Sequence, residues 1–316
     1  MKYSAMFHHF HDDDKYPNSK GGGSISATDF HSIIDYMDEN YNLITPNEFT
    51  QKVVNKSIKE FDVCLTFDDG LKSQFDVIYP ELEKRKLKAF FFVYSGAFSK
   101  NPPLLEWFRD FRLFFFKNIN EYYELFFEII QSNHSEEYST FLKNYKPDYL
   151  SNYSFYTIND RKYRFLRDMV LKDKYFDVVL SLMKEKDYSI SSRKEYLFMS
   201  TDNIKKLHES GHSIGLHSHN HPTSLQRLSY KNQLEEYTKN YEFINSITNE
   251  KITSMSHPLG NYNNDTLKIL KKLEIKVGFR DSLFPSSIKS ALEIPREDHT
   301  NIIKVIRKNE NNSLYQ

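Results

Sequence analysis

The sequence is poor in cysteine, has no excess of either charge, and contains no long apolar run. Cys64 is the only cysteine among 316 residues, which excludes an intramolecular disulfide and a cysteine-based zinc site. Lysine plus arginine and aspartate plus glutamate both number 43, so the charge gives no electrostatic basis for binding nucleic acid. No stretch of about 18 residues is both apolar and uncharged, and no membrane span is therefore predicted.

The N-terminal residues, MKYSAMFHHFHDDDKY, lack the apolar segment of a signal peptide. Together with the single thiol in an apolar run, this favours a cytoplasmic location. What the chain does contain is 39% hydrophobic residues, including 26 Phe and 22 Tyr. That content is sufficient for a large buried core and excludes global disorder. The oligomeric state is left open.

Apolar runs alternate with helical patterns in two parts of the chain. Residues 61–67 (FDVCLTF) and 89–96 (AFFFVYSG) are typical of strands buried in a parallel sheet, and the segment between them has helical spacing that Pro80 interrupts. The alternation resumes after residue 200, with strands expected in HSIGLHSHNH, ITSMSHP and KVGFR. Strand, helix and strand in this order predict an α/β fold.

Residues 102–196 differ in character, because they are rich in Phe, Tyr, Lys and Glu and contain no glycine. Aromatic residues such as Trp107, Phe111 and Phe114 recur at helical spacing. We expect a mostly helical insertion whose aromatic stripe packs internally, and which caps the mouth of the α/β domain. An interaction module that docks on a glycosyltransferase or a membrane face is the alternative.

Asp68 and Asp69 follow directly on the apolar run that ends at Phe67. Adjacent carboxylates raise each other's pKa unless a positive charge lies near. The Asp-Gly pair is also a turn signal, but the residues that follow, LKSQF, do not begin a second alternating strand. Consecutive residues that leave a strand point to opposite sides, so one carboxylate is expected to bind a divalent cation and the other to act as a general base.

His217 and His221 lie four residues apart after another apolar run. Imidazole and carboxylate together are common ligands of zinc-like metals. In an α/β barrel the functional residues gather at the C-terminal ends of the strands. The two histidines and one of the aspartates are therefore predicted to meet at a metal site.

Three segments, TFDDG (66–70), HSHNHP (217–222) and HPLGNYN (257–263), resemble in order and spacing the motifs of the polysaccharide deacetylase family. These are carbohydrate esterases related to the nodulation-factor deacetylase. The resemblance covers residues 1–101 and about 197–284. It implies a distorted (β/α) barrel of about seven parallel strands, formed by residues 1–101 and 197–316, with 102–196 as an insertion.

The resemblance also implies roles for the matching residues. Asp68 would be the general base, and Asp69, His217 and His221 the ligands of a divalent metal. Zn²⁺ is the first candidate, and Co²⁺, Ni²⁺, Fe²⁺ or Mn²⁺ are alternatives.

Around that centre, the turn of Pro258, Leu259 and Gly260 would bind substrate and supply an oxyanion N–H donor, by its position in the third motif. The arginine that usually precedes this motif and holds the base is replaced by Ser256. Ser218 is expected to orient the loop of the two histidine ligands through a local hydrogen bond.

Four further residues are expected at the same rim. Arg280 and Arg296 are candidates to replace the missing arginine and to reach the substrate. His299, in LEIPREDHT, is expected to be the general acid, although its spacing departs from the family pattern. His8, which ends the first strand, is expected to lie near the metal or the substrate.

These features predict a metal-dependent hydrolase that removes an N-acetyl group from an acylated amino sugar in the synthesis of a bacterial surface glycan, such as capsule or lipopolysaccharide. A nucleotide-linked or lipid-linked sugar is the expected substrate. Removal of a formyl or another small acyl group is one alternative, because the sequence does not reveal the size of the pocket. A catalytically silent carbohydrate-binding barrel is the other.

Overall fold

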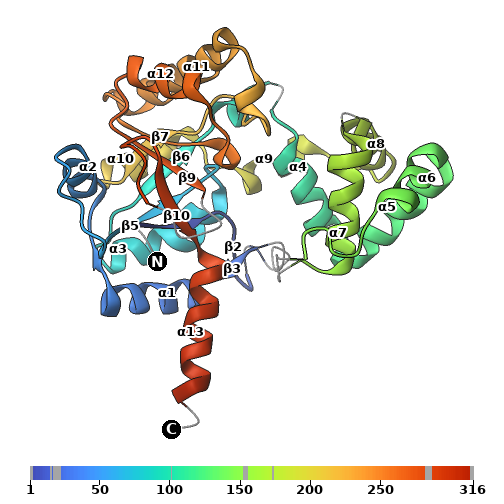
Figure 1. Cartoon of the computed structure of the whole chain (residues 1–316), viewed down its shortest axis with the longest axis horizontal. Coiled ribbons are helices and arrows are strands. Elements are labelled where there is room, and N and C mark those ends of the chain that lie inside the picture. Colours follow the sequence, from blue (N-terminus) through green and yellow to red (C-terminus); the bar gives the residue numbers. More distant parts are fainter. Residues whose placement is uncertain are drawn as a thin grey trace. The chain divides into compact units, whose positions relative to one another are not determined.

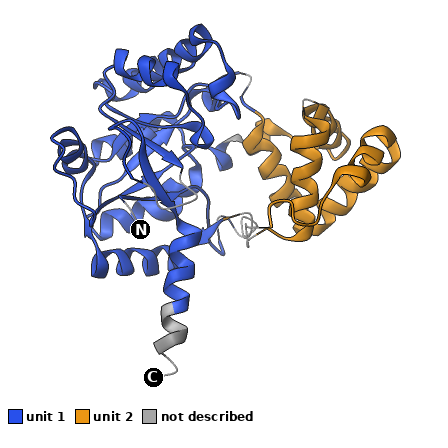
Figure 2. Cartoon of the chain, in the orientation of Figure 1, with its two compact units in different colours: residues 1–17, 24–103, 195–316 blue, residues 18–23, 104–194 orange. Residues whose placement is uncertain are grey.

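The computed structural model describes residues 3–14, 16, 23–100, 102–151, 156–172, 174–281 and 287–313. The chain divides into two compact units, shown in different colours in Figure 2. The first, which we call the barrel unit, comprises Met1–Pro17, Ser24–Pro103 and Glu195–Gln316. The second, the helical unit, comprises Asn18–Gly23 and Leu104–Lys194.

The elements follow one another along the chain as strands alternating with helices, except in the helical unit (Figure 1). The strands are β1 Ser4–Phe7, β2 Phe10–His11, β3 Ile25–Ser26, β4 Asn42–Leu43, β5 Asp62–Phe67, β6 Phe90–Val93, β7 Ser213–Leu216, β8 Ser254–Ser256, β9 Val277–Asp281 and β10 Ile294–Asp298. The α-helices are α1 Ala27–Asn40, α2 Pro46–Val54, α3 Tyr79–Lys84, α4 Leu105–Asp110, α5 Ile119–Asn133, α6 Ser135–Asn144, α7 Ile158–Phe165, α8 Lys174–Glu185, α9 Ile190–Leu197, α10 Thr201–Glu209, α11 Tyr230–Thr248, α12 Asn264–Lys272 and α13 His299–Ser313. Short 3₁₀ or π-helical turns are η2 Gln74–Ile78, η3 Ser95–Phe98, η4 Phe111–Phe115, η5 Leu166–Leu171, η6 Leu225–Arg227 and η7 Pro258–Gly260.

Seven parallel strands close into a barrel in the order β1, β5, β6, β7, β8, β9, β10. Closure depends on β1, which pairs with β5 on one side and with β10 on the other. The short strand β4 adds to the outer side of β5. The predicted (β/α) barrel of about seven parallel strands is confirmed.

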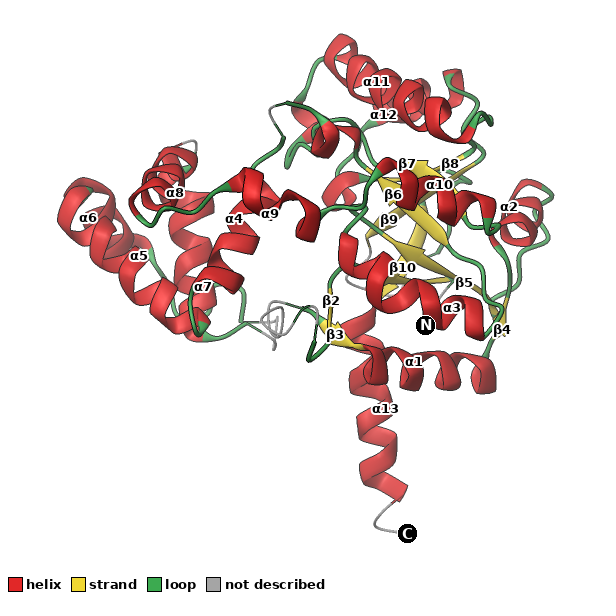
Figure 3. Cartoon of the chain, turned by 180° about the vertical axis from the view of Figure 1, so that it is seen from behind, coloured by secondary structure: helices red, strands yellow, loops and turns green. Residues whose placement is uncertain are grey.

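Alternate residues of the strands face the two sides of the barrel wall, as the strand period of two requires. Val63, Leu65 and Phe67 of β5 belong to the large core shared with the surrounding helices, whereas Cys64 packs in a second core with aromatic residues such as Phe92. Figure 3 shows the helices of this unit around the strands. The interior of the barrel is thus packed rather than open.

The predicted helix and strand signals correspond closely to the observed elements. Ser26 caps α1 and Asn263 caps α12, and the expected break at Pro80 is the passage from the π-helical turn η2 to α3. Helix α2 begins within the segment LITPNEF, where Thr45 caps it. No strand was expected at Ile294–Asp298, because proline and three charged residues follow its first residue.

The helical unit has an aromatic core of its own. Trp107, Phe111, Tyr122, Phe126 and Tyr163 are buried. Three pairs of these rings, Phe111–Tyr122, Tyr122–Tyr163 and Phe126–Tyr163, pack edge to face with centroids 5.0–6.1 Å apart. In the described parts of both units, no helix is long and apolar enough to cross a membrane.

Acid should weaken the barrel unit through His212, which precedes β7. Burial lowers the pKa of this histidine to about 4, and its Nδ1 accepts the N–H of Ala89 at 3.2 Å. Because the unfolded chain binds the proton near pH 6.5 and the native state only near pH 4, native stability falls as the pH drops between these values. The loss attributable to His212 is up to about 3 kcal/mol. His212→Asn keeps an acceptor for Ala89 but cannot titrate, so denaturant unfolding from pH 7 to pH 4 should show a smaller loss for the variant. Equal losses would contradict the prediction.

Candidate active site

Three buried side chains converge at the C-terminal ends of β5 and β7. The Oδ1 atom of Asp69 lies 3.4 Å from the Nε2 atoms of both His217 and His221. The two Nε2 atoms are 3.2 Å apart. The triad is thus a triangle of three potential ligand atoms, all facing one point.

The triad fits a divalent metal. Ligand atoms about 2.1 Å from a tetrahedral zinc ion lie about 3.4 Å from one another, which is close to the observed separations. Asp69 Oδ1 is buried without a hydrogen-bond partner among the described residues, and a buried carboxylate oxygen of that kind requires a cation. Two imidazoles and one carboxylate suit zinc and several other first-row ions.

Arg296 of β10 holds Asp68 through two parallel hydrogen bonds. Its Nη1 donates to Asp68 Oδ1 and its Nη2 to Oδ2, both at 2.7 Å. Ser256 Oγ also donates to Oδ2, at 3.1 Å, and accepts from Arg296 Nη2 at 2.9 Å. The Arg296 side chain is only 1% exposed. Its contacts give it a positioning role.

Arg280 does not take the place of the missing arginine. Its Nε donates to the carbonyl oxygen of Glu293 and its Nη2 to that of Ser287, whereas the hydrogen bonds to the Asp68 carboxylate come from Arg296 and Ser256. The neighbouring strand β9 therefore directs its arginine toward the segment that leads into β10.

The two aspartates do not point to opposite sides, contrary to the expectation. His217 Nε2 lies 3.9 Å from Asp68 Oδ2 as well as 3.4 Å from Asp69 Oδ1. The reason is that Asp69 adopts a φ of 77°, which ends the extended alternation of the strand. Positive φ also occurs at Ser218 (62°), His221 (50°) and Leu259 (50°), so left-handed conformations that cost free energy in non-glycine residues gather around this site.

The charges of the site are set by burial and by close partners. Burial alone would raise the pKa of Asp68, but the charges of Arg296 and His217 and the Arg296 hydrogen bonds lower it to about 2. Burial is likewise outweighed at Asp69, whose pKa is lowered chiefly by His217 and His221. Burial lowers the pKa of His221 to about 4. Both aspartates are therefore ionised and His221 is neutral at pH 7, the states that ligands and a general base require.

The loop that carries the two histidines is held from several sides. Ser218 Oγ accepts the N–H of His221 at 3.1 Å, which is the expected local hydrogen bond. The Nδ1 atom of His217 faces the carbonyl oxygen of Ser256 at 2.9 Å. Asn240 of α11 accepts the N–H of His217 at 2.8 Å and donates to the carbonyl oxygen of Val93 at 2.9 Å. If His217 Nδ1 carries the proton and donates it to the carbonyl oxygen of Ser256, the lone pair of Nε2 is free to bind a metal.

The two candidate acids occupy different environments. His8 Nε2 lies 3.8 Å from Asp68 Oδ2, and the His8 side chain is 29% exposed. His299 lies at the start of α13 with a side chain only 4% exposed. Its ring stacks on Phe7 at 5.9 Å, and its Nδ1 faces the carbonyl oxygen of Met6 at 3.3 Å. The structure thus places His8 beside the catalytic carboxylate and His299 in the packing beneath β1.

Backbone hydrogen bonds hold the turn Pro258–Gly260, the proposed oxyanion donor. Gly260 N–H donates to the carbonyl oxygen of His257, and Asn261 N–H to that of Pro258. These bonds leave the N–H of Leu259 outside the hydrogen bonds of the turn, and the Leu259 residue is 53% exposed. Gly260 adopts a φ of 66°, and a β-carbon there would lie 3.0 Å from the β-carbon of Asp281.

Three further residues, Gln74, Asn240 and Thr66, hold the site together, and the sequence predicted no role for them. The amide of Gln74 donates to the carbonyl oxygens of both His8 (2.8 Å) and Asp68 (2.6 Å), and so ties the first strand to the catalytic loop. Thr66 Oγ1 donates to the carbonyl oxygen of Ala5 at 2.8 Å and receives a bond from Arg296. The sequence did contain a signal for Asn240, because this polar residue lies on the same face of α11 as the buried Tyr237 and Ile244.

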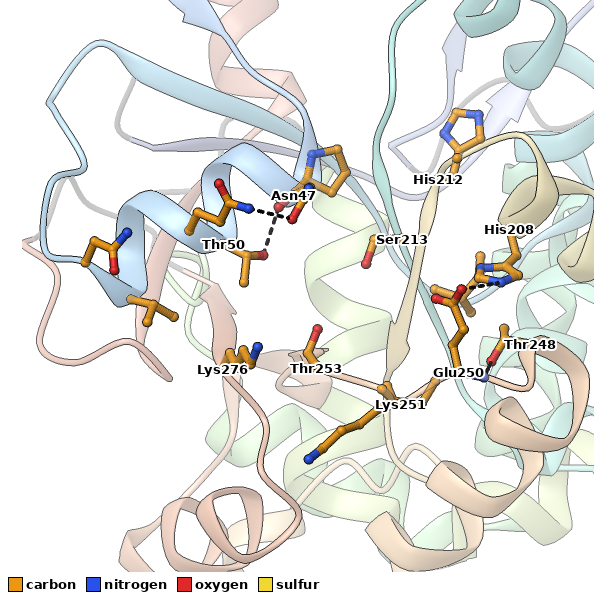
Figure 4. A pocket seen from close by; sticks show the side chains of 17 residues that line it. Asn47, Thr50, His208, His212, Ser213, Thr248, Glu250, Lys251, Thr253 and Lys276 are labelled. Atoms are coloured by element: carbon orange, nitrogen blue, oxygen red, sulfur yellow. Dashed lines mark hydrogen bonds and ion pairs between the residues drawn. The ribbon is translucent and has the colours of Figure 1, made fainter.

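A hollow of about 500 Å³ lies at the other end of the barrel (Figure 4). Its lining includes Ser213, at the start of β7, and Thr253 and Lys276, which precede β8 and β9. It contains none of the site residues predicted from the sequence. The chemistry is thus assembled at the C-terminal ends of the strands, as in other α/β barrels.

Comparison with known proteins agrees with this geometry. The model of the polysaccharide deacetylase family matches residues 55–111 and 171–278, which together make more than half of the chain. The chain therefore belongs to the polysaccharide deacetylase family. No curated protein matches its sequence significantly.

Solved structures with the same fold cover almost the whole chain. The Streptococcus pyogenes deacetylase PplD in complex with acetate is 17% identical, with a TM-score of 0.55 over 97% of this chain and 98% of that one. IcaB from Ammonifex degensii is 15% identical, with a TM-score of 0.56 over 96% of each chain. A de-N-acetylase from Aggregatibacter actinomycetemcomitans is 14% identical, with a TM-score of 0.55 over 96% of this chain and 98% of that one. At these identities the similarity establishes the fold.

Arg296→Gln should impair catalysis by raising the pKa of Asp68. Without the guanidinium, burial of the carboxylate is no longer outweighed, so the acidic limb of kcat/KM should move to higher pH. Activity should fall by about 10- to 100-fold, as for other partners that orient a catalytic group. Acetate release from an N-acetylated sugar as a function of pH measures both effects, with circular dichroism to verify folding. Arg280→Gln on the neighbouring strand is the matched control, and an unshifted acidic limb in Arg296→Gln would contradict the assignment.

Proposed function

We propose that this protein is a metal-dependent carbohydrate de-N-acetylase in which Asp68 is the general base and Asp69, His217 and His221 hold the metal. The observation that carries the proposal is the juxtaposition of two differently partnered carboxylates. Asp68 is neutralised by Arg296, whereas the Oδ1 atom of Asp69 lies 3.4 Å from the Nε2 atoms of both imidazoles. Such a difference separates a base from a ligand.

A divalent ion bound by the triad supplies Lewis acidity toward the acyl carbonyl and an acidified water. Asp68, ionised because of its low pKa, accepts the proton of the attacking water. The exposed N–H of Leu259 donates to the developing oxyanion. Arg296 and Ser256 keep the Asp68 carboxylate in one orientation, which preserves its alignment with the scissile amide.

His8 is the better candidate for the proton donor to the leaving amine, although the sequence favoured His299. A general acid has to come within hydrogen-bond reach of the leaving nitrogen. The His8 ring is partly exposed and close to Asp68, whereas the His299 ring is enclosed against Phe7. Access to substrate therefore favours His8.

The substrate class we propose is an N-acetylated amino sugar of a surface glycan, carried by a nucleotide or a lipid in the cytoplasm. The family description supports the carbohydrate. Metal identity, with zinc first, follows from the two imidazoles and the carboxylate.

Asp69→Ala and Asp68→Asn should separate metal binding from turnover. Asp69→Ala should lose bound metal, because one of three ligands is removed. Asp68→Asn should retain the metal and lose turnover by about 10²- to 10⁴-fold, the usual contribution of a general base. Metal content by mass spectrometry and acetate release from N-acetylated sugars and UDP-sugars measure the two properties. Asp265→Asn, on the surface of α12, is the matched control.

The same measurements distinguish the alternative functions. A wild-type protein with metal but with formate release from N-formyl sugars, and no acetate release, would identify a deformylase. A wild-type protein that binds neither metal nor substrate productively would leave a carbohydrate-binding barrel.

His8→Gln should lower kcat by about 10²- to 10⁴-fold while the metal content stays unchanged. His299→Gln should mainly lower the melting temperature, since it disturbs packing on Phe7. If His299→Gln lowers kcat by that factor and His8→Gln does not, His299 is the acid.

A further inference from the structure

Three arginines gather in the helical unit, and none of them has a role in the hydrolysis that we propose. Arg112 lies in the π-helical turn η4, Arg164 near the end of α7, and Arg167 in the π-helical turn η5 that follows. Arg164 and Arg167 are one helical turn apart. The Arg112 guanidinium lies 5.1 Å from the ring centre of Tyr163, the residue next to Arg164.

Electrostatics also place the three cations in one neighbourhood. The pKa of Arg164 is lowered first by burial, and further by the positive charges of Arg167 and Arg112. Bringing three guanidinium groups together in partly buried positions is unfavourable unless negative charge accompanies them.

Only one of the three is paired with a carboxylate in the part of the chain that the structure describes. Arg167 donates to both oxygens of Asp168, at 2.6 and 2.9 Å. Arg112 and Arg164 instead stack on the faces of Tyr163 and Tyr156. Neither makes a hydrogen bond or ion pair with a described residue, and the Nε atom of Arg112 is buried without a partner.

The neighbouring tyrosines do not supply the missing charge. The pKa values of Tyr122 and Tyr175 are raised well above the usual value of a tyrosine, first by burial and then by neighbouring tyrosines. Their hydroxyls are therefore neutral, and Tyr122 donates to Tyr163, which is itself hydrogen-bonded to Tyr175. Stacking on a ring covers the face of a guanidinium, but its N–H groups lie in the plane and still require acceptors.

We propose that Arg112, Arg164 and Arg167 form a binding site for a phosphate group. A phosphate offers several anionic oxygens to several guanidinium forks, whereas a carboxylate is satisfied by one fork, as Asp168 already shows for Arg167. Two of the arginines lie in π-helical turns, which occur frequently at functional sites. The ligand that carries this phosphate group is inorganic phosphate or a phosphorylated sugar. The proposal does not depend on the proposed hydrolysis.

Calorimetric titration of the full chain with inorganic phosphate and with N-acetylglucosamine 1-phosphate, at constant ionic strength, tests the proposal. Wild type should bind at least one of these probes. Arg112→Gln and Arg164→Gln should each weaken binding by about tenfold or more, because each removes charge-assisted hydrogen bonds. Arg164→Lys, which keeps the charge but not the fork, should bind more weakly than wild type and more tightly than Arg164→Gln.

Lys162→Gln is the matched control, since it removes the same charge from the same helix about 200° from Arg164. It should leave phosphate affinity within about twofold of wild type, because the fork geometry is intact. Tighter binding of the sugar phosphate than of inorganic phosphate would assign the site to a phosphorylated glycan, and equal affinity to phosphate itself.

Absence of binding by wild type to both probes would overturn the proposal, as would unchanged affinity in folded Arg164→Gln. Arg164 is only partly buried, so this variant keeps the test decisive if Arg112→Gln fails to fold. A purely structural role for the arginines would lower the melting temperature of the variants without any phosphate binding by wild type.

Discussion

Two parallel hydrogen bonds connect Arg296 of β10, the last strand of the barrel, to Asp68, which follows β5. The two residues meet because β1 lies between β5 and β10 and closes the barrel. Burial raises the pKa of Asp68, whereas the charges of Arg296 and His217 lower it to about 2. The role that we propose for Asp68 as a base therefore depends on the closure of the barrel.

A second constraint is the concentration of left-handed backbone at the ends of the strands. Asp69, Ser218, His221 and Leu259 all have positive φ, and each such residue costs free energy that the surrounding structure has to offset. Gln74 and Asn240 contribute to this compensation, because their side-chain amides fix the backbone at Asp68 and at His217. The left-handed residues thereby hold Asp69, His217 and His221 in one arrangement.

The helical unit is organised by different rules. Its core is built from aromatic side chains, and its buried tyrosines hydrogen-bond to one another. Arg112 and Arg164 stack on the faces of tyrosine rings. This stacking covers the flat faces of the guanidinium groups and leaves their in-plane N–H groups available for hydrogen bonds. The phosphate site that we propose for this unit depends on those available N–H groups.

The sequence by itself determined the fold class and the motif residues. Apolar runs such as FDVCLTF specify buried parallel strands, and Asp68, Asp69, His217 and His221 are the residue types that metal hydrolysis requires. Tertiary structure decided the rest. Strand β10 could not be predicted, because Pro295 and the charges after it contradict strand propensity, and only pairing with β1 and β9 makes the segment extended. The choice of Arg296 over Arg280, and the enclosure of His299 beneath Phe7, likewise depend on which side of the barrel wall each residue faces. That is set by contacts almost 300 residues apart in sequence, which no local pattern encodes.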